Sequence, residues 1–244
     1  MTDDDKPGPA GKPGAAGQDP VTADSLRERM RSAPVLAGPL PGFDPATAGP
    51  APGPVFARWL ARALDDGVPE PHVMTLATAG ADGRPSARVL MLRGVDIEGC
   101  AFDFASEAAS RKGRDLAERP YACLSWYWPA HGRQVRMAGA VRTLDRDTAR
   151  RDFLGRREAS RAAGFTGLMS APLDGRAAYE HARRRAAGHV AAAPEDVPEG
   201  HTVYRLVADE AEFWQADPAG GHVRLRYLRD PAAPEGWTRG LLWP

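Results

Sequence analysis

The chain has 244 residues, enough for one domain with a substantial hydrophobic core and an additional tail. Its 32 Lys and Arg residues balance its 32 Asp and Glu residues, so the formal net charge is zero. This balance argues against nucleic acid or an anionic membrane as a partner, although it allows a local basic pocket for a small anion.

Two cysteines, Cys100 and Cys123, lie in apolar runs without a paired spacing, which argues against a disulfide framework and a zinc ribbon. No metal is expected either, because His181 and His189 lie eight residues apart on one predicted helix without a cluster of carboxylates. The first residues lack a signal-peptide pattern, and no stretch has the roughly 20 apolar residues that span a bilayer. We therefore expect a cytoplasmic protein.

Residues 1–54 contain 11 of the 23 prolines and 8 of the 26 glycines. Such a segment buries too little side chain to offset the entropy of ordering it, so we predict that it is largely flexible. Two exceptions are expected within it: a short helix over residues 24–32, and an apolar stretch over 34–41 that lies along the folded body.

Residues 55–244 are predicted to form the ordered domain, which begins with a helix whose apolar residues recur at helical spacing up to Asp65. Further helices are expected over 110–118, over 145–156 with Asp145 or Asp147 as N-cap, and over 174–190. The predicted strands cover residues 72–77, 86–93, 100–106, 121–128, 134–144, 202–215, 223–228 and 237–242.

Short turns join most of these strands, as in the Asp82-Gly83 hairpin. A meander of antiparallel strands with inserted helices is typical of a β-barrel with helical additions, and not of a parallel βαβ sheet. The predicted fold class is mainly β with helical additions (α+β).

Basic residues in the middle of the chain suggest an anion site. Arg88 and Arg93 lie at the two ends of an apolar strand, where burial is costly unless they meet an anion. Arg111 and Lys112 follow Ser110 at the start of a predicted helix, where cations oppose the helix dipole unless an anion is bound. Each motif alone has a simple structural explanation as solvated strand ends or surface charge.

Three further motifs follow in the chain: Arg133-Gln134-Val135, Glu212-Phe213-Trp214-Gln215 and His222-Val223-Arg224. Taken with the two basic motifs, and in the same order, they resemble the pyridoxine/pyridoxamine 5′-phosphate oxidase family. The resemblance extends from about Phe56 to Pro244. It implies an antiparallel, FMN-binding split β-barrel that forms a homodimer with FMN at the interface.

The resemblance also assigns residues to the cofactor. Arg88, Arg111 and Lys112 would hold the FMN phosphate with Ser106 nearby, Gln134 would donate to the isoalloxazine ring, and Ser170 would reach the cofactor from the partner subunit. Met169 stands where the family has Gln. The full implied FMN-binding set is Arg88, Val89, Leu90, Met91, Leu92, Arg93, Ser106, Arg111, Lys112, Gln134, Met169, Ser170, Trp214 and Arg224.

On the substrate side the resemblance is less complete. Arg156, Ser160 and His222 match family positions, with His222 and Arg156 as the catalytic candidates. Arg93 stands in place of a Lys, Asp152 in place of a Tyr, and Gly220 in place of a second Arg. An ionised Asp152 would repel a phosphate dianion. The implied substrate-binding set is Arg93, Asp152, Arg156, Ser160 and His222.

These residues predict an FMN-dependent oxidase that transfers a hydride from an amine or a reduced N-heterocycle to flavin N5, with O2 reduced to H2O2. Three alternatives remain: a genuine pyridoxamine 5′-phosphate oxidase that makes pyridoxal 5′-phosphate, a dihydrophenazine-type oxidase of specialised metabolism, and a non-catalytic carrier of flavin or pyridoxal phosphate. The sequence leaves the substrate open.

Overall fold

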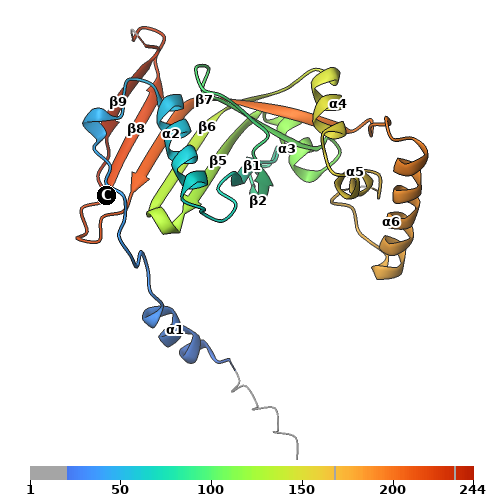
Figure 1. Cartoon of the computed structure of the whole chain (residues 1–244), viewed down its shortest axis with the longest axis horizontal. Helices are drawn as coiled ribbons and strands as arrows, with labels where there is room; N and C mark the ends of the chain where they lie inside the picture. Colours follow the sequence, from blue (N-terminus) through green and yellow to red (C-terminus); the bar gives the residue numbers. More distant parts are fainter. Residues whose placement is uncertain (1–20, 168, 234) are drawn as a thin grey trace, which may run out of the picture.

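The computed structural model describes residues 21–167, 169–233 and 235–244 (Figure 1). Its elements are, in chain order, α1 (Ala23–Ser32), the 3-10 turn η1 (Pro45–Thr47), α2 (Pro52–Asp65), β1 (Val73–Ala79), β2 (Pro85–Met91), β3 (Gly94–Asp96), β4 (Ala101–Glu107), α3 (Arg111–Glu118), β5 (Tyr121–Trp128), η2 (Pro129–His131), β6 (Arg133–Thr143), α4 (Arg146–Leu154), α5 (Glu158–Gly164), α6 (Gly175–Ala192), β7 (His201–Gln215), β8 (Val223–Arg229) and β9 (Trp237–Leu241).

The strands form one curled antiparallel sheet with the order β2-β1-β5-β6-β7-β4-β3. The 15-residue strand β7 organises it, because β4 pairs with the first half of β7 and β8 with the second half. Figure 1 shows β7 running across the molecule, from the helices α4 and α6 at one end to β8 and β9 at the other. This is the split-barrel fold that the sequence predicts.

The helix α2 closes the concave side of the sheet. Its Phe56 is fully buried, and the ring centroids of Phe102 and Trp126 lie 4.9 and 4.8 Å from that of Phe56. Trp59 on the same helix packs edge-on against Phe213 of β7, with the centroids 5.3 Å apart. Aromatic pairs at these separations add to the energy of area burial, so this cluster stabilises the packing of α2 against the sheet.

The packed body begins before Val55, where the sequence analysis placed its start. The ring of Phe43 lies 4.9 Å from that of Trp59, Ala48 is buried in the same core, and Arg239 of β9 donates to the carbonyl of Gly49 at 3.0 Å. Part of the Pro- and Gly-rich segment before Val55 is therefore ordered by tertiary contacts, which its composition does not indicate. Residues 1–20 of the predicted flexible segment lie outside the described residues.

The predicted helix over residues 24–32 is confirmed as α1, which Thr22 and Ser25 cap reciprocally. In the apolar stretch over 34–41, Leu40 reaches Gly132 whereas Val35 is exposed, so only its end lies along the body. Asp145 caps α4 as expected, and its side chain accepts from the backbone N–H of Thr148 at 2.7 Å.

The short elements β3 and α5 were not predicted, because three and seven residues carry too little periodicity. Within the described residues, no helix is both long enough and apolar enough to cross a bilayer.

Candidate functional site

The predicted site residues form three groups. The first group is a cationic cradle at the start of α3. Ser110 caps this helix by accepting from the backbone N–H of Gly113, and its hydroxyl lies 3.2 Å from that of Ser106 at the end of β4. Arg111 and Lys112 occupy the first helical turn, where unpaired backbone N–H groups and the helix dipole already favour an anion. A Cβ on Gly113 would lie 2.1 Å from the carbonyl oxygen of Ala108, so only glycine allows this close approach.

Arg88 on β2 lies beside this helix. Its guanidinium donates to the Leu76 carbonyl at 3.1 Å and to the Thr78 hydroxyl at 2.8 Å, both on the neighbouring strand β1, and to Ser86 at 2.9 Å. Asp115 on α3 accepts from Thr78 at 2.7 Å and lies 3.9 Å from Arg88. The buried Thr78 hydroxyl thus links β2 to α3 and fixes the direction of Arg88.

The electrostatics of the cradle indicate an anion site. Burial lowers the pKa of Arg88, and the Arg111 charge lowers it further, whereas Asp115 acts in the opposite direction. Burial also lowers the pKa of Lys112, with Arg88 adding to the effect. Holding three cations so close is costly unless a polyanion binds among them, and a phosphate with several charge-assisted donors satisfies this requirement.

Replacing Thr78 with Val is expected to lower the free energy of unfolding by about 1–3 kcal/mol, because the isosteric side chain leaves the buried Asp115 without its donor. Urea denaturation of the apoprotein measures this change. The control is Thr143→Val at the exposed end of β6, which should change the stability by less than about 0.5 kcal/mol. Equal stabilities of the two variants would show that the Thr78 hydroxyl does not connect the elements.

The segment between α5 and α6 covers the cradle. The backbone N–H of Arg111 points to the hydroxyl of Ser170 at 3.4 Å, and Lys112 Nζ lies 3.5 Å from the Met169 sulfur. The resemblance assigns Ser170 to the cofactor of the partner subunit, and this assignment stays a prediction. Within one chain Ser170 lies beside the cradle, because the loop after α5 folds back over the start of α3.

A second cluster joins Arg93, Arg156, Asp152 and His201. Asp152 Oδ2 accepts from Arg156 at 2.5 Å and from His201 Nε2 at 2.9 Å, and Asp152 Oδ1 lies 3.7 Å from Arg93 Nε. Burial opposes ionisation of Asp152, but the His201 hydrogen bond and the Arg156 charge outweigh it, so the pKa of Asp152 lies below its ordinary value. Asp152 is therefore a carboxylate and serves as the counter-ion of the two arginines.

His201 was missed by the sequence analysis. It is buried at the start of β7, and its Cα pairs in register with that of Glu107, whereas its carboxylate partner Asp152 is 49 residues away in the sequence. No local motif marks such a residue. Only the crossing of α4 over the end of β7 brings the two side chains together.

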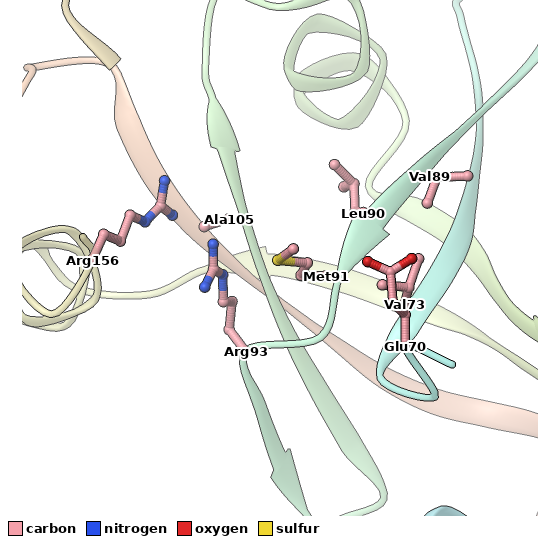
Figure 2. A pocket seen from close by; sticks show the side chains of 8 residues that line it. All are labelled: Glu70, Val73, Val89, Leu90, Met91, Arg93, Ala105 and Arg156. Atoms are coloured by element: carbon pink, nitrogen blue, oxygen red, sulfur yellow. The ribbon is translucent and has the colours of Figure 1, made fainter. Parts of the chain in front are cut away.

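Two cavities lie beside these clusters. The smaller has a volume of about 360 Å³, and Figure 2 shows Val89, Leu90, Met91, Arg93 and Arg156 among its lining residues. The larger, of about 570 Å³, is lined by predicted site residues (Leu90, Ser106, Lys112, Arg156, Ser160 and Met169) together with apolar residues from α4, α5 and α6. Arg156 borders both cavities, so the cradle and the second cluster open onto adjoining space.

The third group lies on the opposite part of the sheet. Gln134 on β6 pairs in register with Trp214 on β7, which pairs with Arg224 on β8, so the three form a row across the strands. His222 lies next to this row, with its ring centroid 5.0 Å from that of Trp214. The buried Glu212 accepts from Arg224 at 2.8 Å and from Arg136 at 3.1 Å, which fixes the direction of Arg224.

Within one chain, the row of Gln134, Trp214 and Arg224 lies far from the cradle. Ser106 pairs with Thr202, and Trp214 lies twelve residues farther along β7. At about 3.3 Å per residue the two groups are separated by roughly 40 Å along the strand. The two catalytic candidates, His222 and Arg156, are likewise at different ends of β7. The residues of the predicted site therefore form two separate halves.

Comparison with known proteins identifies the family of the chain. The family model for pyridoxamine 5′-phosphate oxidase matches residues 60–215, and the model for the C-terminal dimerisation region of pyridoxine 5′-phosphate oxidase matches residues 201–244. The chain belongs to the pyridoxamine 5′-phosphate oxidase family of FMN-dependent oxidoreductases. The second match includes Trp214, His222 and Arg224, so half of the site lies in a region named for dimerisation.

Individual members of the family are similar over most of the chain. A pyridoxine/pyridoxamine 5′-phosphate oxidase of Burkholderia multivorans is 45% identical over 202 residues, which are 83% of this chain and 93% of that protein. PhzG from Burkholderia lata, solved in complex with tetrahydrophenazine-1-carboxylic acid, is 30% identical with a TM-score of 0.78, covering 85% of this chain and all of that one. An FMN-binding protein of Nostoc punctiforme shares the fold, with 20% identity and a TM-score of 0.60 over 78% of this chain and 97% of its own.

Gly220 is one of the departures that the pyridoxamine 5′-phosphate oxidase resemblance raised, and the structure gives it a local reason. It closes a turn by donating to the Asp217 carbonyl at 2.9 Å, and its φ of +91° lies in the region that favours glycine. An arginine at this position would strain the turn. The conformation of this turn therefore favours glycine at position 220.

Proposed function

We propose that the chain binds FMN, with the phosphate in the cradle of Arg88, Arg111 and Lys112. The observation that carries this proposal is a group of three neighbouring cations: Arg111 and Lys112 lie at the N-terminus of α3, and Arg88 lies beside them on β2. Burial lowers the pKa of both Arg88 and Lys112. A phosphate dianion supplies the charge that such a cluster lacks. The hydroxyls of Ser106 and Ser170 are near enough to complete its hydrogen bonds.

The site is completed by a second copy of the chain. The row of Gln134, Trp214 and Arg224 has donors and an aromatic face suited to a flavin ring, but it lies too far along β7 to reach the cradle of the same chain. The proposed two-fold homodimer sets the row of one subunit over the cradle of the other, and its symmetry repeats this contact so that both sites are completed. The match of residues 201–244 to a dimerisation region supports this arrangement.

The proposed reaction is the oxidation of an amine or a reduced N-heterocycle. When bound, FMN supplies the hydride-accepting chemistry and the reaction with O2 that yields H2O2. The residues of the chain bind and orient the substrate: Arg93, Arg156 and Ser160 hold its polar group beside the cavities, and His222 and Trp214 of the partner's row close the other side. The positioning of the reacting atoms is the main contribution of such residues to the rate.

Two relatives favour different substrates. The 45% identity to pyridoxine/pyridoxamine 5′-phosphate oxidases supports a second candidate, the oxidation of those phosphates to pyridoxal 5′-phosphate. The PhzG complex supports a larger reduced N-heterocycle, because that protein binds tetrahydrophenazine-1-carboxylic acid. The apolar lining of the larger cavity, with Phe153, Leu173 and Tyr179, favours a ring system over a small aliphatic amine.

An absorbance spectrum of the purified protein tests the cofactor, and an anaerobic titration tests the reaction. We expect flavin bands near one FMN per chain, which bleach when pyridoxamine 5′-phosphate, pyridoxine 5′-phosphate or a reduced phenazine is added without oxygen. Readmitted oxygen should restore the bands and produce H2O2. Tight FMN binding without bleaching by any of these compounds would support a flavin carrier and exclude the proposed oxidase function.

A further inference from the structure

The cations that face the substrate cavities already have an internal counter-ion. Figure 2 shows Arg93 and Arg156, which both line the smaller cavity, extending their guanidinium groups into the same region. Asp152 lies with them, 3.7 Å from Arg93 and 2.5 Å from Arg156, and its side chain is only 14% exposed. The place where the resemblance puts a substrate phosphate therefore contains a protein carboxylate.

His201 holds this carboxylate in place. A carboxylate only accepts hydrogen bonds, so Nε2 of His201 carries a proton and donates to Asp152 at 2.9 Å. The two arginines and the aspartate together carry a net charge of +1. The other charged residues that line the cavities are one lysine, Lys112, and two glutamates, Glu70 and Glu107, so they add no excess of positive charge.

Arg93 keeps free donors beside this counter-ion. Its side chain makes no hydrogen bond with any residue in the described ranges 21–167, 169–233 and 235–244, whereas Arg156 donates one hydrogen bond to Asp152 and its buried Nε has no partner in the same ranges. A guanidinium fork binds a planar carboxylate with two parallel hydrogen bonds. The cluster can thus accept one carboxylate in full charge balance, but a phosphate dianion leaves one negative charge uncompensated next to Asp152.

We propose that Asp152, held by His201, is a specificity-determining residue that sets the substrate site for a reduced ring carrying a single carboxylate and discriminates against phosphate esters. The inference rests on the proposed oxidase function. It refines the sequence-based expectation of repulsion, since Asp152 is an ordered member of an ion cluster and not a loose charge at its edge.

The test is the ratio of two dissociation constants for the FMN-loaded protein at pH 8. Pyridoxal 5′-phosphate and phenazine-1-carboxylate are titrated against wild type and Asp152→Asn while the flavin absorbance is followed. Coulomb energy scales with the product of the charges, so a change that strengthens monoanion binding about 10-fold should strengthen dianion binding about 100-fold. In Asp152→Asn, the affinity for pyridoxal 5′-phosphate relative to that for phenazine-1-carboxylate should therefore rise about 10-fold.

Asp147→Asn is the matched control, because it removes the same charge from an exposed position on the same helix. Its ratio, and that of Asp152→Glu, should equal the wild-type ratio. If Asp152→Asn fails to fold, the two dissociation constants of the wild type are compared. Tighter binding of phenazine-1-carboxylate supports the proposal, and tighter binding of pyridoxal 5′-phosphate overturns it. An unchanged ratio in Asp152→Asn also overturns it.

The two proposals fail separately in this design. A flavin that no substrate reduces would exclude the oxidase, yet the binding ratio would still be measured. An unchanged binding ratio would exclude the role of Asp152, yet the flavin could still be reduced.

Discussion

Replacing Lys112 with Met is expected to weaken FMN binding about 30- to 150-fold, which corresponds to the ~2–3 kcal/mol of a hydrogen bond between charged groups. Lys112 is buried beside Arg88 at the start of α3, and Met retains most of its volume. Fluorescence titration of the apoprotein with FMN measures the change. Arg84→Ala is the control, because Arg84 is exposed on the hairpin between β1 and β2 and should leave the affinity unchanged.

The same substitution should not destabilise the apoprotein at neutral pH. The pKa of Lys112 in the folded chain lies below the ordinary value of 10.5, so the charged form is disfavoured by folding. This penalty is present at pH values below the folded pKa and disappears as the pH rises to 10.5. The melting temperature of the wild type should therefore rise relative to that of Lys112→Met between pH 7 and pH 10. A variant that loses both FMN and apoprotein stability at pH 7 would indicate a structural role for Lys112 instead.

Mixing two variants, each with one half of the site damaged, should restore full-affinity FMN binding at about a quarter of the sites. Lys112→Met damages the cradle, and the double change Trp214→Ala/Arg224→Met damages the row. Random pairing makes about half of the dimers mixed, and one of the two sites in each mixed dimer combines an intact cradle with an intact row. Co-expression with two tags, followed by measurement of FMN content and H2O2 production, gives the recovered fraction.

The pair Arg88→Ala and Lys112→Met serves as the control for this mixing experiment. Both changes lie in the cradle, so no site in their mixed dimer is intact and no recovery is expected. Recovery with this pair, or its absence with cradle and row variants that still dimerise, would contradict a site built from two chains. Size-exclusion chromatography of each mixture establishes the dimer.

The sequence indicated the candidate cofactor residues more directly than the role of Asp152 at the candidate substrate site. Arg88, Arg111 and Lys112 lie in short motifs whose function follows from local structure, a strand end and a helix N-terminus. Asp152 lies mid-helix, where its sequence context says nothing about Arg93 or His201. Its role as a counter-ion depends on distances between three elements.

The amino-acid sequence by itself determined the order of the longer strands and helices, the antiparallel fold class and the family, because hydrophobic periodicity, turn residues and short motifs are local properties. It also named the cradle residues as candidates one by one. Only the tertiary structure decided that Ser170 lies beside Arg111 within one chain, that the row lies at the other end of β7, and that Phe43 and Ala48 are part of the core. These facts depend on contacts between residues far apart in the chain, whose spacing leaves no periodic signal.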